Sequence, residues 1–159
     1  MNPLSAAFGA GVALRNFCYG HGVFKSRKLA RPVISVGNIS VGGSGKTPFV
    51  IALGQLLRDR GIEFDVLSRG YGRSSGEAAV VHPEGRPEQF GDEPLLIARR
   101  LHVPVIVGAS RYSAGLLAER QFNSKLHLLD DGFQHRRLHR DFEIVLLQSA
   151  DLDDTLLPV

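Results

Sequence analysis

The feature that most constrains the fold is a glycine-rich loop between an apolar run and a helix-forming segment. The apolar run Val33–Val36 is typical of a strand, and the apolar residues 48–53 are typical of the start of a helix. The loop between them therefore follows a strand and opens a helix. Glycines let backbone N–H groups converge on one concavity, and the helix start adds the positive end of its dipole. This arrangement predicts a phosphate-binding loop. The loop consists of Ser40, Val41, Gly42, Gly43, Ser44, Gly45, Lys46 and Thr47.

Two residues at the end of the loop carry the chemistry of such a site. Lys46 is expected to reach the β- and γ-phosphates of a nucleotide, and the Thr47 hydroxyl is expected to ligate Mg²⁺. The loop departs from the usual pattern at its first position, where Ser40 replaces glycine and the nearest upstream glycine is Gly37. An ordinary glycine-rich turn would explain the glycines but not the adjoining Lys46 and Thr47. The segment therefore predicts ATP binding.

A second motif supports this interpretation. The apolar run Leu126–Leu129 ends in two acids, Asp130 and Asp131. In P-loop enzymes an Asp at the carboxyl edge of the sheet holds the Mg²⁺ that bridges the nucleotide phosphates. Asp131 also precedes Gly132, so a role as a turn residue is the alternative for it. Together with the upstream loop, the two acids predict a metal site.

The rest of the chain alternates strand-like and helix-like segments, as in a parallel α/β sheet. We therefore expect a P-loop NTPase-like α/β fold with a mostly parallel sheet and flanking helices, preceded by an N-terminal amphipathic helix. We expect a loop over 83–91 and a helix capped by Asp92. The expected strands are about 32–37, 64–67, 78–82, 104–107, 126–129 and 142–147, and the expected helices about 47–60, 92–101 and 111–121.

Charge is distributed unevenly along the 159 residues. The first 58 residues hold seven Lys and Arg and no Asp or Glu, whereas the rest hold 12 Lys and Arg against 16 Asp and Glu. A basic leading segment favours an anionic partner surface. No nucleic-acid-binding motif is present, so we expect a membrane surface and no nucleic acid. The single cysteine, Cys18, excludes a disulfide framework within the chain.

The leading segment also carries apolar residues. Residues 4–14 are apolar or small, Arg15 interrupts them, and the remaining cations follow them. The run is too short to cross a bilayer, and a secretory signal would place its cations first. Residues 1–31 are therefore expected to form an amphipathic segment in a membrane interface. Packing of this segment on the domain is the alternative, and the two are compatible.

Further candidates follow other predicted strands or open predicted helices. Asp92 and Glu93 begin a helix, where a capping role is the alternative. Arg69 lies in a glycine-containing loop suited to an anionic ligand, and Arg111 opens a helix from which it could contact a phosphate. A solvated loop and a surface position are the respective alternatives. The basic cluster 134–140 could meet an anionic substrate or be an exposed loop.

Taken together, these motifs resemble those of the tetraacyldisaccharide 4′-kinase family. The resemblance covers essentially the whole chain, in order. It implies transfer of the γ-phosphoryl group of ATP to the 4′-hydroxyl of a tetraacylated glucosamine disaccharide 1-phosphate, at the cytoplasmic face of the bacterial inner membrane. No obligate protein partner is implied. The segments that carry the resemblance are 35–48, 68–72, 91–94 and 130–135.

The resemblance also implies residue roles. Lys46 and Thr47 serve ATP and Mg²⁺, Asp130 and Asp131 belong to the metal and catalytic centre, and Asp92 matches the family's base for the sugar hydroxyl. The other matching active-site positions are Arg69, Tyr71, Glu93, Arg111, Gln134 and His135.

The family continues beyond the position at which this chain stops, Val159. We expect residues 32–159 to be a kinase core truncated before a second half, with little turnover on its own.

Other classes of P-loop protein fit less well. Membrane-surface ATPases of the Min, Par and arsenical-pump type carry an extra lysine directly before the glycine pair, where this chain has Val41. A GTPase would need an Asn-Lys-x-Asp guanine-binding motif, and 123–126 does not match it. A nucleotide-binding lipid sensor that holds ATP without transferring phosphate stays open as the alternative.

Overall fold

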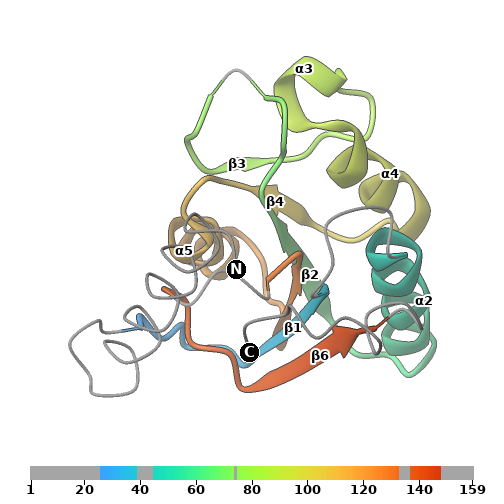
Figure 1. The fold of residues 1–159 in the computed structure, drawn as a ribbon, viewed down its shortest axis with the longest axis vertical. Coiled ribbons are helices and arrows are strands. Elements are labelled where there is room, and N and C mark those ends of the chain that lie inside the picture. Colours follow the sequence, from blue (N-terminus) through green and yellow to red (C-terminus); the bar gives the residue numbers. More distant parts are fainter. Residues whose placement is uncertain (1–25, 39–44, 74, 133–136, 148–159) are drawn as a thin grey trace, which may run out of the picture.

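The structure is a computed structural model that describes residues 26–38, 45–73, 75–132 and 137–147. Strands and helices alternate along the described chain, as the sequence predicts (Figure 1). The elements are β1 (Val33–Asn38), α2 (Lys46–Asp59), β2 (Phe64–Ser68), β3 (Ala79–Val80), α3 (Pro87–Phe90), α4 (Asp92–Leu101), β4 (Val105–Val107), α5 (Arg111–Gln121), β5 (Leu126–Asp130) and β6 (Phe142–Leu146).

The strands form one six-stranded sheet in the order β3-β4-β2-β5-β1-β6. Only the short β3 runs antiparallel, against β4, and the other neighbouring pairs are parallel. The strand β5 therefore lies between β1 and β2, although it comes much later in the chain. Because parallel strands end at the same edge, the segments that follow β1, β2, β4 and β5 gather at one edge of the sheet.

Helices cover both faces of the sheet, with α2 and α4 on one side and α5 on the other (Figure 1). The α2/α4 side buries the larger apolar cluster, which includes Val36, Val66 and Leu101. The α5 side buries a second cluster, which includes Leu67, Ile106 and Leu129. Alternate residues of the central strands point to opposite clusters, so both faces of β2 and β5 are buried. The sequence predicts this α/β class correctly.

The structure corrects two local expectations. The segment 83–91 contains the short helix α3 (Pro87–Phe90) instead of being a continuous loop. Asp92 is the first residue of α4 and does not cap it, because the cap position belongs to Gly91. Gly91 has a φ of 87°, a left-handed conformation that side-chain-bearing residues rarely adopt.

Residues 26–32 lead into β1 and pack on the α5 side of the domain. Leu29 is buried in the second apolar cluster. The Arg27 N–H donates to the Arg137 carbonyl over 2.9 Å, and Arg27 forms an isolated bridge with Leu138. The expected amphipathic helix of the N-terminal segment lies mostly outside the described residues. No helix among the described residues is long and apolar enough to cross a membrane.

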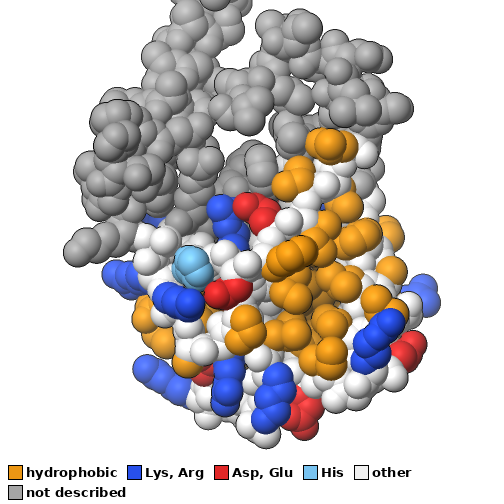
Figure 2. Space-filling view, turned by 90° about the horizontal axis from the view of Figure 1, so that it is seen from below, with side chains coloured by type: hydrophobic (Ala, Val, Ile, Leu, Met, Phe, Trp, Pro, Cys, Tyr) orange, Lys and Arg blue, Asp and Glu red, His pale blue; other side chains and the backbone are white. Residues whose placement is uncertain are grey.

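The edge strand β6 leaves apolar side chains on the surface. Phe142 is 65% exposed, and Leu147, directly after the strand, is 53% exposed. Apolar side chains also gather on the face of the molecule seen from below (Figure 2).

Candidate active site

The carboxyl ends of β2 and β5 and the start of α2 bring most of the described site residues around one cavity of about 520 Å³. The strands β2 and β5 contribute the residues that end them or directly follow them, α2 contributes its first residue, and the start of α4 closes another side. The lining residues are Lys46, Ser68, Arg69, Gly70, Tyr71, Asp92, Glu93, Pro94, Asp130 and Asp131.

Lys46, the first residue of α2, is held by groups from two strand ends. Its Nζ lies 2.6 Å from Oδ1 of Asn38 and 3.5 Å from Oδ1 of Asp131. Gly45 before it has a φ of 74°, which a glycine adopts without strain. Thr47 follows as the second residue of the helix. Residues 40–44 of the predicted loop lie outside the described residues.

Asp130 is the buried acid of the site and is 1% exposed. Its Oδ2 accepts a hydrogen bond of 3.1 Å from the hydroxyl of Ser68, the last residue of β2. Burial raises the pKa of Asp130 to about 6, and the negative charges of Glu93 and Asp131 act in the same direction. The Ser68 hydrogen bond and the Lys46 charge act against this rise. A nearby cation would therefore stabilise the charged form.

Asp131 occupies a tight turn directly after β5 and is exposed. Its φ is 52°, in the left-handed region that Asp tolerates better than most residues. Gly132 then donates its N–H to the Val36 carbonyl over 3.0 Å and accepts from the Arg140 guanidinium at 3.0 Å. A Cβ on Gly132 would collide with Ser35 and Leu129. The turn is thus fixed on both sides, with the two acids at the cavity.

The start of α4 meets the loop after β2 through two glycines. A Cβ on Gly91 would lie 2.9 Å from the Tyr71 carbonyl oxygen, and one on Gly70 would lie 2.8 Å from the Phe90 carbonyl oxygen. Both glycines also have positive φ values. This close backbone approach places Arg69 and Tyr71 beside Asp92 and Glu93 at the same cavity. It explains physically why both motifs contain glycine.

Arg111, the first residue of α5, is buried and is not the surface residue that the sequence left open. Its Nη1 donates to the carbonyls of Gly108 and Ala109 over 3.3 and 3.4 Å. Burial and the nearby Arg69 charge lower the pKa of Arg111 to about 10, and Asp131 and Asp130 act against this. Arg111 is thus electrostatically coupled to the acids, although it does not line the cavity.

The remaining predicted residues divide into two groups. Arg69 is exposed, and Tyr71 is 84% exposed, so both are open to a large ligand. Gln134 and His135 lie outside the described residues. Sequence reasoning gave no role to Asn38 or Ser68, which contact Lys46 and Asp130. Their position at the ends of apolar strands next to motif residues was the available signal.

The acids and Thr47 offer only oxygen ligands, which suits Mg²⁺. The described residues contain no group of three or more His, Cys, Asp or Glu side chains that could hold a metal ion by themselves. Mg²⁺ is usually held by one or two carboxylates together with substrate phosphates and not by an all-protein cage. The donor set therefore fits a magnesium ion that arrives with a nucleotide.

Comparison with known proteins gives consistent matches. A family model described as tetraacyldisaccharide-1-P 4′-kinase matches residues 1–159. A tetraacyldisaccharide 4′-kinase from Koribacter versatilis is 58% identical and covers 100% of this chain and 52% of its own length. A second, from Aquifex aeolicus, is 48% identical, with coverages of 98% and 50%. The chain spans about half the length of these curated relatives.

A solved structure also matches the fold. It is described as the apo form of LpxK from Aquifex aeolicus in complex with ATP. The TM-score is 0.89 with 46% sequence identity, over 98% of this chain and 50% of that one.

Proposed function

Because this chain belongs to the tetraacyldisaccharide-1-phosphate 4′-kinase family, we propose that it binds Mg·ATP and serves transfer of the γ-phosphoryl group to a lipid-linked sugar. The acceptor is the 4′-hydroxyl of a tetraacylated glucosamine disaccharide 1-phosphate. The observation that carries the proposal is the convergence of Lys46, Asp130 and Asp131 on one cavity at the carboxyl edge of the sheet. A relative bound to ATP supports the choice of nucleotide.

The residues at the cavity suit phosphoryl transfer. Lys46 neutralises charge on the β- and γ-phosphates, and Thr47, Asp130 and Asp131 hold Mg²⁺. When bound there, Mg²⁺ would supply positive charge that offsets the negative charge of the phosphates. The sugar oxygen forms a bond to the γ-phosphorus, the bond to the β–γ bridging oxygen breaks, and Asp92 accepts the hydroxyl proton. The net result is one phosphomonoester and ADP.

The other site residues are assigned to substrate and charge. Arg111 supports the transferring phosphoryl group through its positive charge near the two acids. Arg69 and Tyr71 stand at the open side of the cavity, where a large acceptor would enter. We assign acceptor binding to Arg69, Tyr71, Glu93, Gln134 and His135.

Nucleotide binding is tested with Lys46→Ala. A hydrogen bond to a charged group contributes about 1.5–3 kcal/mol, so ATP affinity should fall by about 10- to 100-fold. Isothermal titration calorimetry with Mg·ATP measures this. The matched control is Lys125→Ala, because the Lys125 side chain forms an exposed ion pair of 3.9 Å with Glu63 and does not line the cavity. Equal ATP affinity of Lys46→Ala and the control would refute the assignment.

Transfer is tested with γ-labelled ATP and tetraacyldisaccharide 1-phosphate. Asp92→Asn, introduced into a chain extended to the full length of the curated relatives, removes the proton acceptor but leaves the phosphate-binding residues in place. Turnover should therefore fall by about 100-fold or more, as for loss of a general base, while ATP affinity stays near that of the unsubstituted chain. A parallel fall in ATP affinity would show that Asp92 serves nucleotide binding instead.

We propose the cytoplasmic face of the inner membrane as the place of action, through residues 1–31. This segment contains Arg15, Lys25, Arg27, Lys28 and Arg31. Cations near an anionic surface contribute about 1 kcal/mol each, so binding to phosphatidylglycerol-containing vesicles should weaken as salt rises. Co-sedimentation at low and high salt measures this. Binding that does not change with salt concentration, or that survives deletion of residues 1–31, would exclude this role.

A further inference from the structure

We infer that Ser68 is a positioning residue of the metal centre, whose hydroxyl fixes the Asp130 carboxylate in the orientation that ligates Mg²⁺. The inference rests on the proposed function, because it takes Asp130 to be a metal ligand. Ser68 itself belongs to none of the motif roles. Its contact with Asp130 joins two strands whose residues are 62 positions apart in sequence.

The sheet register creates this contact. The strands β2 and β5 are parallel, and Leu67 pairs with Leu129, so Ser68 and Asp130 end their strands side by side. The Ser68 hydroxyl donates to Oδ2 of Asp130 over 3.1 Å. The residues are 3% and 1% exposed, so bulk water does not readily replace this bond. Both residues line the cavity at which the other acids lie.

Asp130 needs such a partner because neighbouring charges of both signs act on its carboxylate. The negative charges of Glu93 and Asp131 repel it, and the positive charge of Lys46 attracts it. The carboxylate torsion of Asp is intrinsically broad, so packing alone does not define the direction of its oxygens. A hydroxyl on a neighbouring strand constrains that torsion without adding charge. Partners that orient a metal-ligating group typically affect metal affinity strongly.

Ser35 provides a matched control in the same sheet. It is completely buried on β1, the strand on the other side of β5. Its hydroxyl has no hydrogen-bond partner among the described residues. Removing it deletes the same atom from another fully buried strand position, one that makes no hydrogen bond to Asp130. Ser35→Ala therefore reports the effect of losing a buried hydroxyl, and Ser68→Ala reports that effect together with the loss of orientation.

The test measures metal binding without turnover. Mn²⁺ replaces Mg²⁺, and electron paramagnetic resonance follows its binding to the full 159-residue chain saturated with a non-hydrolysable ATP analogue. Ser68→Ala should weaken Mn²⁺ binding by about 10- to 100-fold. Ser68→Thr keeps the hydroxyl, so its Mn²⁺ affinity should stay within about threefold of that of the unsubstituted chain. This change is well below the effect expected from loss of the orienting contact. Ser35→Ala should also stay within that range.

Each outcome separates the possibilities. If Ser68→Ala binds Mn²⁺ as tightly as Ser35→Ala, the positioning role is wrong while the proposed function stands. If Ser68→Thr is as weak as Ser68→Ala, the hydroxyl is not the operative group, and the inference fails. If the unsubstituted chain itself shows no nucleotide-dependent Mn²⁺ binding, the proposed function and the inference fail together. The inference is supported if Ser68→Ala binds Mn²⁺ weakly while Ser68→Thr and Ser35→Ala bind it nearly as tightly as the unsubstituted chain.

Discussion

The neighbouring strands β2 and β5 carry a buried polar contact at each end, and the two contacts differ in how their charge is balanced. At the amino end, Nδ1 of His127 lies 2.8 Å from Oδ1 of Asp65, with both side chains fully buried. At the carboxyl end, Ser68 donates to Asp130 over 3.1 Å. The same register places both pairs side by side. Only the amino-end pair contains its own cation.

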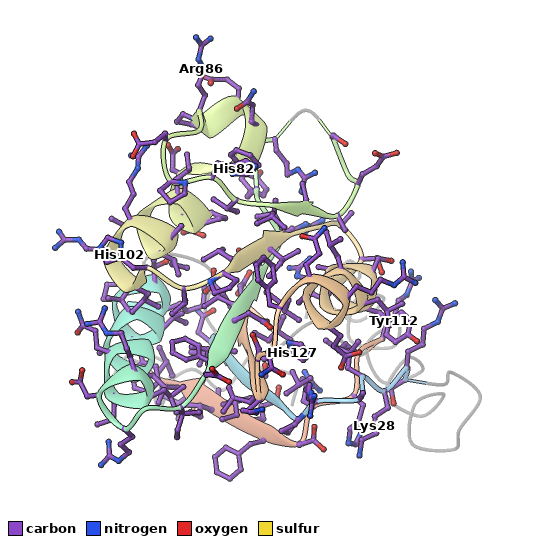
Figure 3. All side chains as sticks on the ribbon, turned by 180° about the vertical axis from the view of Figure 1, so that it is seen from behind. Lys28, His82, Arg86, His102, Tyr112 and His127 are labelled. Carbon is purple, nitrogen blue, oxygen red and sulfur yellow. The ribbon has the colours of Figure 1, made fainter. Side chains whose placement is uncertain are left out.

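The amino-end contact belongs to a larger buried cluster that ties the sheet to α5. His127 lies centrally, between the sheet and this helix (Figure 3). Its Nε2 is 3.4 Å from Oε1 of Glu119, which also accepts the Arg31 N–H over 2.8 Å. Burial alone would lower the pKa of His127, but the hydrogen bonds and charges of Asp65 and Glu119 raise it overall.

The two contacts differ in where the counter-charge for the buried acid comes from. Two carboxylates flank an imidazole at the amino end, so the protein neutralises its own buried charge there. At the carboxyl end, Asp130 faces the like charges of Glu93 and Asp131 and has only a neutral hydroxyl as its direct partner. Buried charge without a direct counter-ion is costly unless a ligand supplies one. This arrangement supports the proposal that the carboxyl end binds a cation from outside the protein.

The largest effect is expected where the internal counter-ion is removed. His127→Leu leaves Asp65 as a buried carboxylate without its cation, and removal of one partner of a buried pair costs about 3–5 kcal/mol. The free energy of unfolding at pH 6 should fall by that amount in urea denaturation followed by circular dichroism.

The exposed pair Lys125–Glu63 is the control for this prediction. It joins the same ends of β2 and β5, but its side chains are 56% and 61% exposed. Lys125→Ala should change the free energy of unfolding by less than about 1 kcal/mol. If His127→Leu costs no more than Lys125→Ala, the amino-end cluster is not the internally balanced site described above.

At the carboxyl end, removal of the buried charge is expected to raise the free energy of unfolding instead of lowering it. The pKa of Asp130 is raised from 3.8 to about 6, so the folded state favours the protonated acid. Stability is therefore highest below pH 4 with respect to this group and falls as pH rises through 6. A shift of this size corresponds to about 3 kcal/mol at most. Without metal or nucleotide, Asp130→Asn should recover up to that amount at pH 8.

Urea denaturation from pH 4 to 8 measures the effect of Asp130→Asn, with Ser35→Ala as the control. The substituted chain should lose the part of the pH dependence that lies between pH 4 and 6. A variant that is less stable than the unsubstituted chain at pH 8 would show that the charged form of Asp130 is already compensated inside the protein.

The sequence predicts the elements of this fold better than their arrangement. Apolar runs and the glycine-rich loop predict the strands and the helix α2, because burial periodicity is local information. The insertion of β5 between β1 and β2 depends on packing of both sheet faces, which no local pattern records. The contact of Gly70 with Gly91 is similarly non-local, and it brings the Tyr71 loop to α4.

The same distinction applies to the site residues. Lys46, Asp130 and Asp131 are predictable because their chemistry is bound to a sequence motif with fixed spacing. Ser68 and Asn38 give a weaker signal, their position at strand ends next to motif residues, because each acts through a partner on another element. His127 stands inside an apolar strand, and only the register that places it beside Asp65 reveals its charged environment.

The smallest effect should come from Glu119, the outer partner of His127. Glu119→Gln keeps an oxygen acceptor for the Arg31 N–H but removes the charge that lies 3.4 Å from Nε2. The free energy of unfolding at pH 6 should fall by about 1 kcal/mol, as for loss of one net hydrogen bond.

The stabilisation by His127 is complete below its unfolded pKa of about 6.5 and is lost as pH rises through the raised folded pKa. Removing Glu119's charge should therefore shift this loss to lower pH, which an NMR titration of the His127 ring measures directly. If Glu119→Gln costs as much as His127→Leu, then Glu119 and not Asp65 is the main counter-charge, and the amino-end cluster balances its charge through α5 instead of through β2.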